Sequence, residues 1–219
     1  MSDSQFTAPY LSAFDCVLNQ EPAVYCSTEL TSGYRLYETM HKRNVPTVKQ
    51  LDEVDKNIFP AIKEENKKAA ALFASKVRGE QTDGAMVINP APLEVPGWGQ
   101  TEYLAFWYEL IRTRVKEVRF NENWEFSNGC TGELAEALKN PDIATFDSEG
   151  HHLAADKAVE AVEAAVQKLE TWGVSEEPRA QTLRDNLGQL QRILRERPEV
   201  LRVALKPVSH RAGEKTVKP

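Results

Sequence analysis

Four short apolar runs alternate with segments of helical periodicity, and this alternation constrains the fold of the chain more than any other feature. The runs cover residues 23–27, 85–92, 115–123 and 142–147. They contain valine, isoleucine and tyrosine and are bounded by turn residues, which predicts β-strands. Strands that alternate with helices are typical of a parallel sheet covered by helices on both faces. The sequence therefore predicts an α/β fold.

The segments between the strands repeat their apolar residues at helical spacing. We expect helices over residues 47–78, with a break or kink at Pro60, over residues 101–114, with Thr101 as the N-cap, and over residues 132–139. Two further amphipathic helices are expected at residues 154–173 and 177–198.

The length of 219 residues fits one domain with extensions. We expect an irregular N-terminal arm over residues 1–21, an α/β domain over residues 22–150, and C-terminal helices of the same domain over residues 151–200. Residues 201–219 carry five basic side chains against Glu214 and form a basic tail, with solvation as its simplest role.

Composition and charge narrow the function classes. The net charge of −6 argues against charge-driven binding to duplex nucleic acid. No apolar run is long enough for a transmembrane helix, and no signal peptide is expected, so we predict no membrane partner. The 3 cysteines show no metal-binding spacing, which predicts reduced thiols, a cytoplasmic location and no metal site.

Turn-rich segments follow three of the predicted strands: STELTSG, NPAPLEVPGWG and NENWEFSNGCTG. The carboxyl ends of parallel strands meet at one edge of a sheet, where ligands bind in folds of this class. We therefore expect these three loops to form one rim that carries the functional site.

The third loop runs into the predicted helix through two glycines, Gly129 and Gly132. They are interpreted as flanking a sharp turn at which backbone N–H groups are free to bind a phosphate or carboxylate, with Ser127 as a cap or ligand. The alternative for these three residues is a turn with only a structural role.

Glu133 falls in the first turn expected for that helix, where the helix dipole alone favours an acid. Its neighbours point to more than a structural role. Trp124 can stack on a base and Asn123 can hydrogen-bond one, while Tyr25 and Ser27 end the first strand on the same rim.

The spacing Ser127-x-Gly129-x-x-x-Glu133, after a strand and at the start of a helix, resembles the signature of the nucleoside 2-deoxyribosyltransferase-like superfamily, and within it the 2′-deoxynucleoside 5′-phosphate N-hydrolase branch. VYCSTELTSGYR and NPAP are similar to its first two strands and loops. The resemblance spans residues 22–148 and implies a flavodoxin/Rossmann-like sheet, here with a C-terminal helical extension.

The resemblance implies cleavage or transfer of the N-glycosidic bond of a nucleoside, nucleotide or related metabolite, without a cofactor. Glu133 would be the nucleophile or would stabilise the oxocarbenium-like species, since a carboxylate opposes developing positive charge. Ser127 and Gly129 would contact sugar or phosphate. At the position of Ser127 the transferase branch has an aspartate, so this residue fits the hydrolase branch better. The family's second acid has no clean match, and Glu109 and Glu102 remain candidates.

Two other functions stay open. A module with the same pocket could sense a nucleotide without cleaving it, which gains support if neither Glu109 nor Glu102 reaches the pocket. A weaker possibility is an interaction protein built around the C-terminal helices. Cys130 and the pair His151–His152 are interpreted as packing and loop residues.

The last predicted helix carries an apolar stripe that consists of Leu183, Leu187, Leu190, Ile193 and Leu194. A domain of this size has little surface left to bury it. We therefore expect the stripe to pack on a second subunit of a homodimer or larger homo-oligomer, or on the N-terminal arm.

Overall fold

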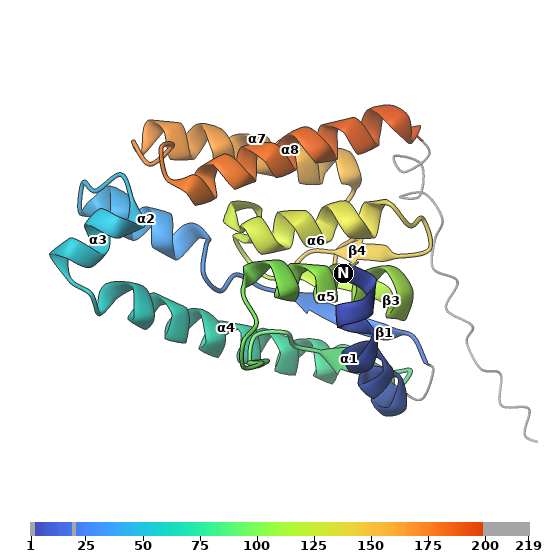
Figure 1. The fold of residues 1–219 in the computed structure, drawn as a ribbon. Helices are drawn as coiled ribbons and strands as arrows, with labels where there is room; N and C mark the ends of the chain where they lie inside the picture. Colours follow the sequence, from blue (N-terminus) through green and yellow to red (C-terminus); the bar gives the residue numbers. More distant parts are fainter. Residues whose placement is uncertain (1–2, 19–20, 199–219) are drawn as a thin grey trace, which may run out of the picture.

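The computed structural model describes residues 3–18 and 21–198 and contains one parallel sheet (Figure 1). Its 4 strands are β1 (Ala23–Ser27), β2 (Val87–Ile88), β3 (Val115–Phe120) and β4 (Ala144–Phe146), in the order β2-β1-β3-β4. Every neighbouring pair is parallel. The predicted α/β fold is confirmed: this is a flavodoxin/Rossmann-like sheet flanked by helices, with its switch in strand order between β1 and β3.

The central strand β1 is buried on both faces, and its side chains alternate between two cores. Val24 and Cys26 pack against Phe73 of α4 (Ile58–Glu80). Ala23 and Tyr25 belong to the larger core on the opposite face, with α5 (Gln100–Arg114) and α6 (Asn128–Leu138). Ser27, which is fully buried, continues this second set and so points toward α6.

The predicted helix over residues 47–78 is divided, but before Pro60 instead of at it. Its two parts are α3 (Val48–Val54), capped by the Thr47 hydroxyl, and α4. Pro60 lies in the first turn of α4, where the missing N–H costs no helical hydrogen bond. The helix α2 (Tyr34–Lys42), which the sequence pattern did not predict, connects β1 to this region.

The predicted irregular arm is wrong for most of its length. Residues Asp3–Leu18 form helix α1, which packs on α5. Leu11 and Phe14 lie one turn apart and contact the core, and Asp15 forms an ion pair with Arg114 of α5. The sequence pattern did not predict this helix, because the segment contains Pro9 and its apolar face is short.

Two helices, α7 (Ala155–Thr171) and α8 (Pro178–Glu196), form an outer layer over α6 (Figure 1). The apolar stripe of α8 packs inside this layer: Leu183 and Leu190 are fully buried, while Leu187 and Leu194 are partly buried against the same core. The prediction that the stripe meets a second subunit or the N-terminal arm is therefore wrong, because α6 and α7 already cover it.

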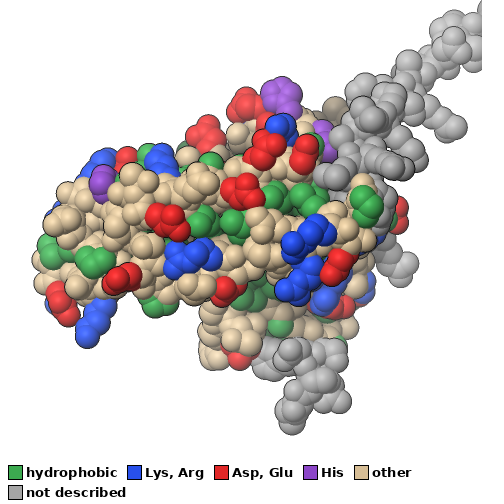
Figure 2. Space-filling model, turned by 90° about the horizontal axis from the view of Figure 1, so that it is seen from above, with side chains coloured by type: hydrophobic (Ala, Val, Ile, Leu, Met, Phe, Trp, Pro, Cys, Tyr) green, Lys and Arg blue, Asp and Glu red, His purple; other side chains and the backbone are tan. Residues whose placement is uncertain are grey.

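The outer surface of this layer is polar. Figure 2 looks onto it and shows acidic and basic side chains interspersed around a narrow band of hydrophobic ones. Among the described residues, the large hydrophobic side chains that are exposed lie on other elements: Tyr10, Val17, Val54, Leu72 and Met86. The apolar stripe of α8 therefore no longer supports a homodimer, which stays a prediction.

None of the helices within residues 3–18 and 21–198 combines the length and the apolar character needed to cross a membrane. The basic tail predicted at residues 201–219 lies outside the described part of the chain.

Candidate functional site

A buried carboxylate connects the central strand to α6. The Tyr25 hydroxyl donates a hydrogen bond of 2.7 Å to Oε1 of Glu133, and the Ser27 hydroxyl donates one of 2.6 Å to Oε2. Because Tyr25 and Ser27 alternate onto the same face of β1, both reach this one side chain. The structure therefore brings together three of the predicted site residues.

The position of Glu133 in its helix differs from the prediction. Helix α6 begins at Asn128, four residues before the predicted start at residue 132, so Glu133 lies in the second turn. The helix dipole acts mainly within the first turn and does not explain an acid here. Only 7% of the Glu133 surface is exposed, and no ion pair of the described residues includes it.

Burial raises the pKa of Glu133, whereas the hydrogen bonds from Ser27 and Tyr25 oppose this rise because they stabilise the ionised form. Burial, together with the nearby Glu133 carboxylate, also raises the pKa of Tyr25 well above its usual value. Tyr25 thus stays a hydroxyl donor, and among the described residues the ionised form of Glu133 is stabilised by hydroxyl groups instead of a cation.

The two glycines of the motif lie inside α6, and neither has a positive φ. The predicted sharp glycine turn is therefore wrong. Gly132 packs closely on Tyr108: a Cβ there would lie 1.9 Å from the Tyr108 hydroxyl oxygen, so a larger residue would have to displace that ring. A Cβ at Gly129 would make only an ordinary contact of 3.8 Å with Ser127 Oγ.

Hydroxyl groups occupy the N-terminus of α6, which was the predicted anion site. The Ser127 hydroxyl caps the helix by accepting a hydrogen bond of 3.4 Å from Cys130 N–H, which confirms its predicted capping role. Ser32 Oγ accepts one of 3.1 Å from Asn128 N–H. These two N–H groups are satisfied within the protein and are not free for a phosphate.

A groove of about 500 Å³ lies at the carboxyl ends of the strands, beside the switch in strand order. Its walls come from the loops after β1, β3 and β4 and from α2 and α4. The polar lining includes Glu29, Arg35, Asn66, Asn121, Asn123 and Glu149. The loops after β1 and β3, two of the three predicted rim segments, thus meet at one site. The loop after β2 does not line the groove.

Glu29 is a groove residue that the sequence analysis missed. Its carboxylate lies at the start of α2, where Oε2 accepts a hydrogen bond of 2.9 Å from Tyr34 N–H. Burial raises its pKa to about 7. The signal in the sequence was an acid two residues after the first strand and four before Gly33, within a loop already assigned to the rim.

Asn123 and Trp124 have different environments. Asn123 lines the groove in a left-handed backbone conformation with φ of 60°. Trp124 is 6% exposed, and its ring packs against Phe120 with 4.9 Å between centroids. Its indole therefore lies in the core and does not line the groove.

The two candidates for the second acid lie elsewhere on α5. Glu109 forms a surface ion pair of 2.6 Å with Arg112. Glu102 accepts a hydrogen bond of 2.8 Å from Gly99 N–H and stabilises the start of the helix. Neither lines the groove. Cys130 is fully buried and burial raises its pKa, as expected for a packing residue.

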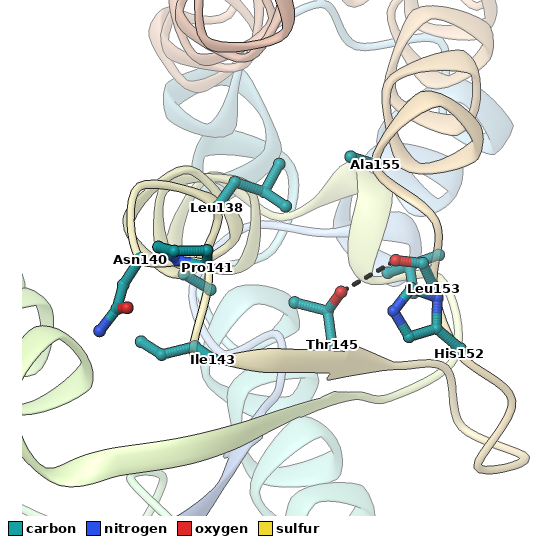
Figure 3. Close-up of a pocket in the computed structure, with 9 residues that line it drawn as sticks. Leu138, Asn140, Pro141, Ile143, Thr145, His152, Leu153 and Ala155 are labelled. Carbon is teal, nitrogen blue, oxygen red and sulfur yellow. Dashed lines mark hydrogen bonds between the residues drawn. The ribbon is translucent and has the colours of Figure 1, made fainter. Parts of the chain in front are cut away.

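A second hollow of about 20 Å³ lies between the end of α6 and the segment after β4 (Figure 3). Thr145 Oγ1 donates a hydrogen bond of 2.9 Å to the Leu153 carbonyl there, and His152 forms part of the wall. The space suits about one water and no nucleoside. No cluster of three or more metal-ligating side chains occurs among the described residues.

Comparison of the chain with protein-family models, with curated proteins and with solved structures found no match.

Proposed function

We propose that the protein cleaves or transfers the N-glycosidic bond of a nucleoside, nucleotide or related metabolite. The observation that carries this proposal is the hydrogen bonding of the Glu133 carboxylate by both Tyr25 and Ser27. The fold brings these groups together across 108 and 106 positions of the sequence, and no described residue forms an ion pair with the acid. Burying a carboxylate in this way is costly for stability, which favours a chemical role.

A buried carboxylate suits the reaction because glycosidic cleavage develops positive charge on the anomeric carbon. Electrostatic stabilisation is stronger in a site that excludes water. The hydrogen bonds from Tyr25 and Ser27 favour the ionised form of the carboxylate and fix its orientation, so that Glu133 can oppose the charge or form a bond to the anomeric carbon.

The groove supports a substrate of nucleoside size. Its volume of about 500 Å³ lies in the range of small-molecule sites. Ala69, Leu72 and Phe73 of α4 offer an apolar wall against which a base can pack, and Asn121 and Asn123 carry amides that pair with the polar edge of a base. In this proposal Ser127 and Gly129 act by forming the start of α6.

A nucleotide-sensing module is the second candidate. Glu133 is 7% exposed and does not line the groove, and Glu109 and Glu102 lie outside it. A ligand in the groove would then bind without contact to the Glu133 carboxylate, and it would not be cleaved.

The proposal extends to a cytoplasmic homodimer that needs no cofactor. Its 3 cysteines form no disulfide, and Cys26 and Cys130 are buried. Sedimentation of the purified chain tests the assembly state.

Incubation with a panel of nucleosides, nucleotides and NAD, with chromatographic detection of free base, separates the two candidates. We expect base release by the wild-type protein and a loss of about a hundredfold or more in Glu133→Gln. Glu109→Gln is the matched control, because its acid lies on the surface, and it should retain wild-type turnover. Saturable binding of a panel member without base release would favour sensing.

A further inference from the structure

The carboxylate of Glu29 is held rigidly beside the groove. Oε2 accepts the hydrogen bond from Tyr34 N–H, and the preceding Gly33 has φ of 131°. A Cβ at Gly33 would lie 1.9 Å from Glu29 Oε2, so only glycine lets the carboxylate approach the backbone this closely. Oε1 accepts no hydrogen bond from the described residues, and the side chain lines the groove. One oxygen is therefore fixed, and the other is left for a ligand.

Burial, a backbone hydrogen bond and nearby charges together set the pKa of Glu29 near neutral pH. Burial raises its pKa to about 7, the Tyr34 N–H and the Arg35 guanidinium of α2 oppose this rise, and the carboxylate of Glu125 adds to it. Tyr37 of α2 and Cys130 of α6 also interact electrostatically with Glu29. A group with these properties can hold a proton and release it at neutral pH.

Glu29 and Glu133 belong to two segments that contact each other, the loop after β1 and helix α6. Glu29 lies two residues after Ser27, and the Ser27 hydroxyl donates a hydrogen bond to Glu133. Ser32, in the same loop as Glu29, accepts a hydrogen bond of 3.1 Å from Asn128 N–H at the start of α6, the helix that carries Glu133. The two acids differ in their surroundings: two hydroxyls bond the Glu133 carboxylate, whereas the Glu29 carboxylate lines the groove.

We propose that Glu29 is the proton donor to the departing base in the glycosidic cleavage proposed above, on which this inference rests. The Glu29 carboxyl proton passes to a ring nitrogen of the base as the bond between that base and the anomeric carbon breaks, and the bonding electrons leave with the base. The Glu133 carboxylate opposes the positive charge on the sugar. A water oxygen then bonds to the anomeric carbon, and its released proton restores the Glu29 carboxyl group.

The test compares two leaving groups on the same sugar. A nucleoside base needs protonation to depart, whereas p-nitrophenolate is stable as an anion and needs none. Glu29→Gln should release base at least about 10²-fold more slowly than wild type and should release p-nitrophenolate at the wild-type rate. Glu109→Gln, with its acid on the protein surface, should leave both rates unchanged.

The pH profile of the wild-type protein gives a second measurement that does not depend on the folding of a variant. Base release should fall as the pH rises through about 7, because the donor loses its proton, and release of p-nitrophenolate should lack this limb. Equal loss of both activities in Glu29→Gln, or identical profiles for the two substrates, overturns the role of Glu29 and leaves the proposed function intact. Failure of the wild-type protein to release any base overturns both.

Discussion

Tyr25 and Glu133 lie 108 positions apart in the sequence and are joined by a buried hydrogen bond of 2.7 Å. The Tyr25 ring is fully buried and packs against Trp107, with 5.7 Å between ring centroids, which orients its hydroxyl toward α6. Burial raises the pKa of this carboxylate, and since it lacks an ion-pair partner among the described residues, this hydroxyl and that of Ser27 are the groups that oppose the rise.

Tyr25→Phe should destabilise the protein and raise the pKa of Glu133 further. The change removes a donor from a buried carboxylate, which costs about 1–3 kcal/mol in the free energy of unfolding. The loss should grow as the pH rises, because the hydroxyl stabilises the ionised form. Urea denaturation across pH measures it. Tyr37→Phe is the matched control, since the buried Tyr37 hydroxyl has no partner among the described residues, and it should be neutral or stabilising.

Glu29 should make the free energy of unfolding depend on pH. Its pKa is about 7 in the folded protein against an ordinary value of 4.5, so the folded state binds more protons than the unfolded state between these values. The stability from this group is present below 4.5 and is lost as the pH rises to about 7, which amounts to about 3 kcal/mol. Glu29→Gln should remove that decline, and equal slopes in the two proteins would contradict the prediction.

Gly33→Ala should be harmful where Gly129→Ala is not. Gly33 has φ of 131° and ψ of −179°, a region that glycine alone adopts easily, at a cost of about 1–3 kcal/mol for other residues. The added Cβ would also meet the Glu29 carboxylate. Gly129 is helical and open, so alanine there should raise stability by up to about 1 kcal/mol. Thermal or urea unfolding of both variants decides this, and a tolerated Gly33→Ala would contradict the assigned geometry.

Leu190→Ala should destabilise the fold without altering the assembly state. Leu190 is fully buried within the layer of α6, α7 and α8, and truncation of such a side chain costs about 2–5 kcal/mol. Leu72→Ala, at a side chain that is 73% exposed, should change stability by less than about 0.5 kcal/mol. Denaturation gives the stability of each variant, and sedimentation gives its assembly state. Dissociation of an oligomer by Leu190→Ala would instead place the stripe at an interface.

The local pattern of the sequence was sufficient for the layered fold. The central strand was predicted at residues 23–27 and found at Ala23–Ser27, and the C-terminal helices were placed to within a few residues. Periodicity carries this information because each element must bury one face. The same logic failed for α1, where Pro9 interrupts the pattern.

The tertiary structure decided which side chains meet. The sequence pointed to Glu133, Tyr25 and Ser27 as separate rim residues, but only the register of β1 against α6 places both hydroxyls on one carboxylate. Packing also moved Trp124 into the core and buried the α8 stripe within the chain.

Glu29 shows the same limit most clearly. In the sequence Glu29 looks like an ordinary acidic loop residue. Its raised pKa arises from burial in the folded chain, where it lies beside the backbone of a glycine. Periodicity reports which face of an element is apolar, whereas the environment of a charge depends on contacts between segments distant in sequence. The sequence by itself therefore determined the layers and the edge of the sheet that carries the groove, and the tertiary structure determined which acids that edge presents.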